Sequence, residues 1–377
     1  MPQAAESVIY IGCMSGTSLD GVDCAAVRFD DRGPVVEQLA WDHRPYPSSL
    51  IETLRRAALG PVDIDALCRL DIQLGRFYAE TLAAFMADAG LPRTAIGAIG
   101  LHGQTLRHAP DDPLPYSLQI GDAATVAAAC NLTVVADFRR RDIALGGQGA
   151  PLTPAFHAYA LRREGEQRAV LNIGGISNLT LLPGQPDRPV TGFDCGPGNC
   201  LIDYLARRDF GQPYDPQGRF AARGRVDTSW LQQLLDGEPY FHRPPPKSTG
   251  TDHFSPQWLA ARDPGGLNAE DRMATITELT AVSIAEALRS SEGDKSADRL
   301  LVCGGGARNR QLMKRLQHHL PGVKVTDTSS EGLDPQRVEA IAFAWLARQT
   351  LLGRPGNLPS VTHARSATVL GSVHPRT

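Results

Sequence analysis

Two glycine-rich turns, each between two apolar runs, most constrain what this chain can fold into. The first, residues 16–23, separates the apolar residues 8–13 from residues 22–29, and the second, residues 174–178, follows about 160 residues later. An apolar run on each side of such a turn predicts a β-hairpin. Either the two hairpins form an internal repeat that opens two homologous halves, or they are unrelated. The pattern alone leaves both readings open.

Strands and helices alternate through most of the chain, which predicts an α/β fold. Apolar residues recur at three- and four-residue spacing over residues 48–90, as in helices, and helices are also expected near 271–290 and 336–352. A loop-rich insertion with a stiff triple proline is expected at 211–264. At roughly 150 residues per domain, 377 residues suggest two or three domains. We place the first at 1–135 plus 357–377 and the second at 136–356.

Composition excludes several classes of protein. A formal net charge of -3 argues against a nucleic-acid binder, which usually carries a basic face. No uncharged apolar run reaches the roughly 18 residues of a membrane span. The N-terminus lacks a basic stretch followed by an apolar one, so we expect no signal peptide and a cytoplasmic protein. The seven cysteines form no CxxC pair, which indicates free thiols rather than a disulfide framework or zinc site.

A nucleotide would have to bind without the usual lysine-bearing loop. A Walker A sequence needs Gly-Lys, and none of the four lysines follows a glycine. A GxGxxG fingerprint is absent too, because GPGNCL and GGGARN lack the last glycine. Backbone N–H groups of a Gly-hydroxyl turn can nevertheless hold phosphate oxygens. The chain therefore offers turns, not a P-loop, for phosphate.

Three such turns occur, in the order hairpin, hairpin, strand-to-helix. The first adds hydroxyls and two carboxylates, Asp20 and Asp23, suited to a hydrated magnesium ion, although Gly, Ser and Asp also favour turns for conformational reasons. The third precedes a helix, whose N-terminus suits an adenosine or phosphate contact. The candidate nucleotide-binding residues are Gly16, Thr17, Ser18, Leu19, Asp20, Gly21, Val22, Asp23, Gly174, Gly175, Ser177, Asn178, Gly304, Gly305, Gly306 and Asn309.

This layout resembles the actin-like superfamily, in which two ribonuclease-H-like halves face each other across a cleft and ATP lies between two phosphate hairpins. Within it, the chain is similar to the anhydro-N-acetylmuramic acid kinase family. The stretches that carry the resemblance span most of the chain: IGCMSGTSLDGVD, LHGQTLRHAP, QIGDAATVA, DFRRRDIALGGQGAPLTP, LNIGGISNLT, GFDCGPGNCLID and CGGGARN.

The resemblance implies a reaction of cell-wall (peptidoglycan) recycling. The substrate would be 1,6-anhydro-N-acetylmuramic acid, whose anhydro bridge is opened by water while ATP phosphorylates O6, giving N-acetylmuramic acid 6-phosphate and ADP. It also implies a homodimer, and a magnesium ion held mainly by ATP and water with Asp20 in the outer shell. Asp194 follows an apolar strand, precedes a Gly-Pro-Gly turn and matches the family's catalytic aspartate. It would be the general base, unless it is only a helix cap.

Other polar residues are candidates for contacts with the sugar. His102, Gln104 and Thr105 follow a strand, and a structural role for the lone histidine is the alternative. Arg139 begins a run of three arginines that is either a solvated face or includes a partner for the lactyl carboxylate. Glu339 lies on a predicted helix, and Asp122 is expected to cap one. Competing functions are an actin-like ATPase switch without a sugar substrate and a glycoside hydrolase without ATP.

Overall fold

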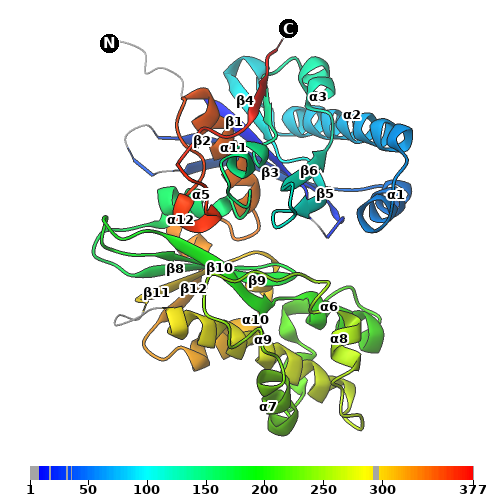
Figure 1. Cartoon of the computed structure of the whole chain (residues 1–377), viewed down its shortest axis with the longest axis vertical. Coiled ribbons are helices and arrows are strands. Elements are labelled where there is room, and N and C mark those ends of the chain that lie inside the picture. The colour runs from blue at the N-terminus through cyan, green and yellow to red at the C-terminus, as the bar shows by residue number, and fades with distance from the viewer. Residues whose placement is uncertain (1–7, 17, 31–32, 35, 292–296, 377) are drawn as a thin grey trace. The chain divides into compact units, whose positions relative to one another are not determined.

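The computed structural model describes residues 8–16, 18–30, 33–34, 36–291 and 297–376. The chain divides into two compact units, the first formed by residues 1–160 and 337–377 and the second by residues 161–336. Each unit is built on its own mixed β-sheet with helices packed against it (Figure 1). No helix in the described part of the chain combines the length and apolar character that a membrane crossing needs.

The first unit contains a six-stranded sheet in the order β13-β7-β4-β1-β2-β3. Its strands are β1 (Ile9–Met14), β2 (Gly21–Phe29), β3 (Val36–Pro45), β4 (Ile96–Leu101), β7 (Val134–Ala136) and β13 (Ser372–His374). A separate hairpin pairs β5 (Gln104–Ala109) with β6 (Tyr116–Ile120). The helices are α1 (Ser48–Leu59), α2 (Ile64–Asp88), α3 (Ala123–Cys130), α4 (Arg140–Ala144), α5 (Thr153–Leu161), α11 (Val338–Leu351) and α12 (Pro359–Thr362).

Opposite faces of this sheet carry different helices, because successive side chains of a strand point to opposite sides. Ile11 and Cys13 of β1 belong to a core shared with α1 and α2. Gly12, between them, points toward α11, where an added Cβ would lie 1.7 Å from the carbonyl oxygen of Ala340. Gly100 of β4 meets Phe343 of α11 in the same way. Helix α11 therefore packs directly on the backbone of the two central strands.

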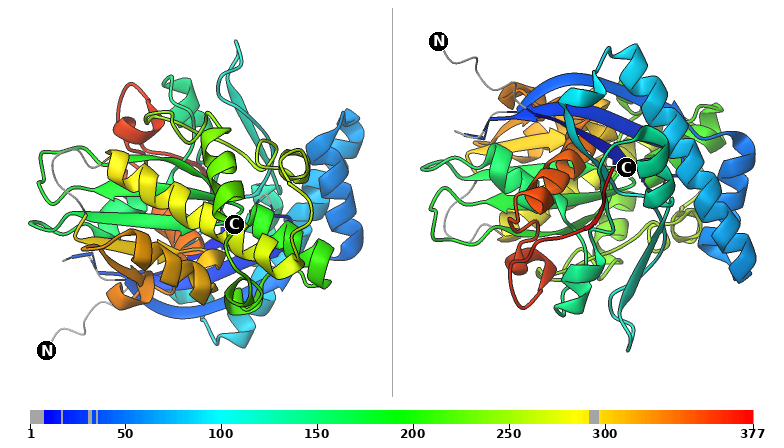
Figure 2. Two further views of the ribbon diagram at one scale, coloured as in Figure 1. Left: turned by 90° about the horizontal axis from the view of Figure 1, so that it is seen from below. Right: turned by 90° about the horizontal axis from the view of Figure 1, so that it is seen from above.

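The second unit contains a five-stranded sheet in the order β10-β9-β8-β11-β12. Its strands are β8 (Arg168–Ile173), β9 (Ile176–Leu182), β10 (Thr191–Pro197), β11 (Arg299–Cys303) and β12 (Lys324–Asp327). Its helices are α6 (Cys200–Phe210), α7 (Thr228–Asp236), α8 (Pro256–Ala260), α9 (Ala269–Ser291) and α10 (Arg310–His319). Figure 2 shows α9, in yellow, lying along the strands, and its buried side chains join α10 in one core with β8 and β11.

The two sheets repeat one topology. In the first unit β1 and β2 pair antiparallel, as do β2 and β3, while β4 lies parallel to β1 and β7 parallel to β4. In the second, β8, β9 and β10 form the antiparallel part, and β11 and β12 add parallel strands on the other side of β8. Both thus have the ribonuclease-H-like order 3-2-1-4-5. The α/β class and the internal repeat are confirmed, and the two hairpins are not unrelated.

The division of the chain lies elsewhere than the sequence predicted. The first crossing falls after residue 160, not 135, and the return begins at residue 337, not 357. Buried Asp142 of α4 accepts hydrogen bonds from Asn357 Nδ2 and Thr362 Oγ1, both at 2.7 Å, which ties residues 136–160 to the C-terminal return. Helix α11 belongs to the first unit because it packs on β1 and β4.

The insertion at 211–264 is more ordered than the sequence suggested. It contains α7 and α8, and it buries a cluster of aromatic side chains against α6 and α9. Members of that cluster are Trp230, Tyr240, Phe254 and Trp258. Its many prolines and glycines favour loops, and for this reason the small core was not predicted from the sequence. All seven cysteines are free, as predicted.

Candidate active site

The first phosphate-type turn joins β1 to β2. Leu19 N–H donates to the Gly16 carbonyl at 3.4 Å, Leu19 has a positive φ of 57°, and Ser18 Oγ donates to Asp20 Oδ1 at 2.7 Å. Thr17 lies outside the described residues. Gly21 and Val22 are already part of β2, and a Cβ at Gly21 would lie 2.4 Å from the Arg44 carbonyl. The glycine at position 21 is therefore explained by the close pairing of β2 with β3.

Asp23 has a partner within its own sheet. Its Oδ1 lies 3.0 Å from His43 Nδ1, and burial raises the pKa of the Asp23 carboxyl although His43 opposes the shift. Asp20, by contrast, is exposed next to the turn. Among the described residues, no cluster of three or more His, Cys, Asp or Glu side chains forms a ready-made metal site.

The side chains of His102 and Gln104 support the first turn through hydrogen bonds to a backbone carbonyl of the turn and to the one before it. His102 Nδ1 donates to the Ser15 carbonyl at 3.0 Å, and Gln104 Nε2 donates to the Gly16 carbonyl at 3.0 Å. Gln104 is fully buried, and its Oε1 accepts from Tyr46 at 3.2 Å. Thr105 Oγ1 accepts from Gln119 at 3.1 Å. Gln104 thus supports the turn, and the contacts of His102, Gln104 and Thr105 with the sugar stay predictions.

Arg139 is brought to the same place by the N-terminus of α4. Its Nη2 donates to His102 Nε2 at 2.9 Å and its Nη1 to the Gly149 carbonyl at 2.9 Å. Because His102 Nδ1 must donate to a carbonyl, Nε2 is the acceptor and the imidazole is neutral. Burial, followed by the charge of Arg139, lowers the pKa of His102 to about 3. Arg139 Nε is buried, and its N–H donates to no partner among the described residues.

The other members of the arginine run and Glu339 complete this part of the first unit. Arg140 and Arg141 are exposed, the usual state of a charge run, and Arg140 pairs with Asp137 at 3.4 Å. Glu339 lies on α11 and its side chain is exposed. Desolvation by the surrounding protein, followed by the negative charge of Asp23, raises the pKa of Glu339, and the positive charge of Arg139 opposes this shift. Arg139, Asp23 and Glu339 therefore interact electrostatically. Asp122 caps α3 as predicted, through Oδ2 and the N–H of Thr125 at 2.8 Å.

The second turn joins β8 to β9 and is anchored to the start of α6. The Gly175 carbonyl accepts from Gly198 N–H at 2.9 Å and the Gly174 carbonyl from Asn199 N–H at 2.8 Å. A Cβ at Gly198 would lie 2.4 Å from the Gly174 carbonyl, so only glycine permits this approach. Ser177 Oγ donates to the Gly196 carbonyl at 3.1 Å and is buried.

The third turn follows β11. Gly304 has φ 79° and donates its N–H to the Pro335 carbonyl at 2.8 Å, while a Cβ at Gly306 would lie 2.3 Å from Ile173. A Cβ at Gly305 would lie 3.6 Å from Asn199 Nδ2, at the start of α6. Asn309 caps α10 through Leu312 N–H at 3.0 Å, so its Oδ1 has a structural partner. A groove of about 520 Å³ adjoins this turn, and it is lined by Ala307, Arg310, Met313, Thr326, Asp327, Ser329 and Ser330.

Asp194 lies within β10, not at a helix cap, and pairs with Asn178 of β9. The ladder is irregular between Asp194 and Gly196, which aims the side chain differently from its neighbours. Its Oδ2 accepts the N–H of Thr249 at 3.0 Å. Burial nevertheless raises the pKa of Asp194 to about 6, because one amide does not replace the lost hydration.

The residues that surround Asp194 were not among those predicted from the sequence. Asp194 N–H donates to the Lys247 carbonyl at 3.0 Å, and Tyr240 Oη donates to the Asp194 carbonyl at 2.8 Å. Both come from the insertion, about fifty residues downstream, which had been interpreted as loop. Only the lysine and hydroxyls directly after the triple proline offered a signal there.

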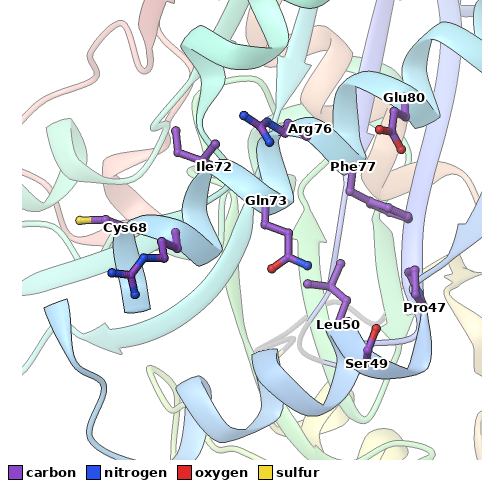
Figure 3. A pocket seen from close by; sticks show the side chains of 10 residues that line it. Pro47, Ser49, Leu50, Cys68, Ile72, Gln73, Arg76, Phe77 and Glu80 are labelled. Carbon is purple, nitrogen blue, oxygen red and sulfur yellow. The ribbon is translucent and has the colours of Figure 1, made fainter. Parts of the chain in front are cut away.

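A separate groove of about 680 Å³ runs between α1 and α2 of the first unit (Figure 3). Arg69, Arg76 and Glu80 border it, and Leu50, Ile72 and Phe77 supply apolar side chains. None of the candidate residues lines it. This groove is therefore distinct from the turns and from Asp194.

The pKa of Asp194 predicts an acid limb in the activity. If Asp194 is the general base that the sequence predicts, it must be deprotonated to act, so kcat/KM should fall tenfold per pH unit below about pH 6 and level off above it. Burial also raises the pKa of Asp203, on α6, to about 6. We expect Asp203→Asn to keep the limb, as measured by initial rates from pH 4.5 to 8. If the acid limb disappears in Asp203→Asn, the limb reports the titration of Asp203, and its assignment to Asp194 is wrong.

Comparison with known proteins identifies the family. The profile of the anhydro-N-acetylmuramic acid kinase family matches residues 8–376. A protein of Xanthomonas oryzae pv. oryzae named anhydro-N-acetylmuramic acid kinase is 48% identical over 374 residues, 98% of each chain, and one of Coxiella burnetii with the same name is 46% identical over 371 residues, 97% of each. A solved ROK-family glucokinase from Streptomyces griseus, in complex with glucose and AMPPNP, covers 90% of this chain and 99% of its own at 13% identity and a TM-score of 0.42. The chain belongs to the anhydro-N-acetylmuramic acid kinase family.

Proposed function

We propose that the protein uses ATP and water to convert 1,6-anhydro-N-acetylmuramic acid into N-acetylmuramic acid 6-phosphate and ADP, a step of peptidoglycan recycling. Family membership supports the substrate and the kinase reaction. The observation that carries the mechanism is Asp194, a carboxylate that is held at one oxygen and has a pKa of about 6. Such a group is a base at neutral pH and can still accept a proton.

The reaction balances with one base. Asp194 takes a proton from water, the water oxygen bonds to C1, and the C1–O6 bond breaks. O6 then attacks the γ-phosphorus of ATP, and the bond between that phosphorus and the β-phosphate oxygen breaks, which releases ADP. Because opening of the bridge generates the O6 nucleophile, no second base is needed. Asp194 finally releases its proton to solvent.

The turns would supply the contacts with ATP. We assign the phosphates to backbone N–H groups of residues 16–20 in the first unit and 174–175 in the second, and the adenosine to residues 304–306 and the adjoining groove. Ser177 and Asn309 would act by shaping these turns, since their side chains bond within the protein. Exposed Asp20 suits the outer shell of a magnesium ion that arrives with ATP and would neutralise phosphate charge. The homodimer and the cytoplasmic location stay predictions.

The direct test measures ADP release with and without the anhydro-sugar. The proposal expects strict dependence on the sugar and one phosphosugar for each ADP. Turnover that does not need the sugar would favour an ATPase switch, and ring opening without nucleotide would favour a hydrolase. Either result would contradict the proposed function.

Arg139 is the proposed partner of the lactyl carboxylate of the sugar. Its Nε has no protein partner among the described residues, while its other nitrogens are fixed by His102 and Gly149. We expect Arg139→Met to raise KM for the sugar by about 10- to 100-fold, because a hydrogen bond to a charged group contributes roughly 1.5–3 kcal/mol. Steady-state kinetics at saturating ATP measures this.

Arg141→Met provides the control, since Arg141 is exposed on the same helix. It should leave KM for the sugar unchanged. An equal KM in Arg139→Met and wild type would remove Arg139 from the sugar site. Glu339 stays a proposed sugar contact on the same electrostatic cluster.

A further inference from the structure

Residues 240–251, which contain the triple proline, form a segment that is hydrogen-bonded to Asp194. Three hydrogen bonds join them: Asp194 N–H to the Lys247 carbonyl at 3.0 Å, Tyr240 Oη to the Asp194 carbonyl at 2.8 Å, and Thr249 N–H to Asp194 Oδ2 at 3.0 Å. Both the backbone and the carboxylate of Asp194 are therefore positioned by this one segment.

The segment is itself held firmly. Lys247 Nζ donates to the carbonyls of Tyr240 and Phe241, both at 3.3 Å, and lies 4.9 Å from the centre of the Tyr240 ring. Tyr240 is 2% exposed within the aromatic cluster. At the other end, a Cβ at Gly175 would lie 3.1 Å from Thr251 Cγ2. The segment thus runs from the candidate base to the second phosphate-type turn.

Thr249 carries a hydroxyl that the protein does not use. Its Oγ1 is buried and has no hydrogen-bond partner in the part of the chain that the structure describes. A hydroxyl has one donor and two acceptor sites, and burying it unpaired is unfavourable. Within the same described residues, Asp194 Oδ2 is occupied by the Thr249 amide, whereas Oδ1 accepts no hydrogen bond. Residue 249 therefore fixes one carboxylate oxygen and places a free hydroxyl beside the carboxylate.

We propose that the Thr249 hydroxyl positions the water that attacks C1, with Asp194 Oδ1 accepting the proton of that water. This inference rests on the proposed function. The water donates one proton to Asp194 Oδ1, and its second hydrogen or a lone pair is held by Thr249 Oγ1. Thr249 is unchanged by the reaction, so the balance given above holds. Its contribution is orientation, which accelerates only the chemical step.

The test replaces Thr249 by valine, which has the same shape and keeps the backbone N–H on Asp194 Oδ2. We expect kcat to fall by about 10- to 100-fold, because a misplaced reactant costs up to about a hundredfold. KM for the sugar and the calorimetric affinity for ATP should change less than twofold. Thr249→Ser, which restores the hydroxyl, should recover most of kcat.

Thr277→Val is the matched control. Thr277 lies on α9 with an Oγ1 that is also buried and unpaired among the described residues, and it is not one of the candidate site residues. It should keep wild-type kcat. Neither valine variant should lower Tm, since each removes an unpaired buried hydroxyl. A loss of kcat in Thr249→Val therefore cannot be attributed to unfolding.

The outcomes separate this inference from the proposed function. If wild type releases no ADP with the anhydro-sugar, both the proposed function and this inference are contradicted. If wild type is active and Thr249→Val keeps kcat within twofold, only the inference fails. A raised KM for the sugar at unchanged kcat would also overturn it, because the hydroxyl would then bind the sugar instead of the water.

Discussion

Asp194→Asn should lose at least about a hundredfold in kcat while it still binds ATP. Removing a general base typically costs roughly 10² to 10⁴ in rate. The amide has the shape of the carboxylate, and its oxygen can still accept the Thr249 N–H. The variant also avoids burying a charge, so Tm at neutral pH should not fall. Single-turnover phosphosugar formation and calorimetry with ATP measure the two quantities.

Asp203→Asn is the control for this prediction. Burial raises the pKa of both carboxyls to about 6, and both belong to the second unit, but Asp203 lies on α6 and not on β10. It should keep wild-type kcat. Near wild-type turnover in Asp194→Asn would show that water attacks without this base, and a different carboxylate would have to be sought.

Much of the architecture could be predicted because its strands, helices and turns depend on residues that are close in the sequence. The hairpins around residues 16–23 and 174–178 place apolar side chains next to glycine and hydroxyl residues, and these signals depend only on neighbours in the sequence. An internal repeat was one of the two readings that these hairpins left open, and the sheet topology decided between them. Asp122 could likewise be identified as a helix cap, since capping acts over three residues.

The support of the site could not be predicted, because it depends on contacts distant in the sequence. Gln104 and His102 form hydrogen bonds with the carbonyls of Gly16 and Ser15, 88 and 87 residues away, while their contact with the sugar stays a prediction. Thr249 reaches Asp194 across 55 residues. No periodicity reports such pairings, which require the fold to be complete.

The domain boundaries were misplaced for a related reason. The sequence predicts a helix at 336–352, but it does not show which sheet this helix packs against. The decisive residues are Gly12 and Gly100, whose missing side chains admit α11 against β1 and β4. A glycine in a strand predicts close approach by some backbone, and the identity of that backbone appears only in the structure.

Gly12→Ala should therefore destabilise the first unit strongly. The added Cβ would lie 1.7 Å from the Ala340 carbonyl oxygen and 2.8 Å from the Ala344 nitrogen, which are backbone atoms of α11 that cannot rotate away. The helix must withdraw from the sheet, at a cost of about 3 kcal/mol or more. For a unit of this size Tm should fall by roughly 6–12 °C. Thermal unfolding followed by tryptophan fluorescence measures it, since Trp345 lies on α11.

Gly60→Ala is the matched control in the same unit. Gly60 has φ -130°, which any residue adopts, and a Cβ there would lie 3.5 Å from the Arg56 carbonyl, an ordinary contact. Its Tm should stay within about 2 °C of wild type, because substitutions away from special features change stability by about 0.5 kcal/mol. If Gly12→Ala unfolds no earlier than Gly60→Ala, α11 is not seated on β1 as described. Helix α11 would then have to be assigned to the second unit, where the sequence alone had placed it.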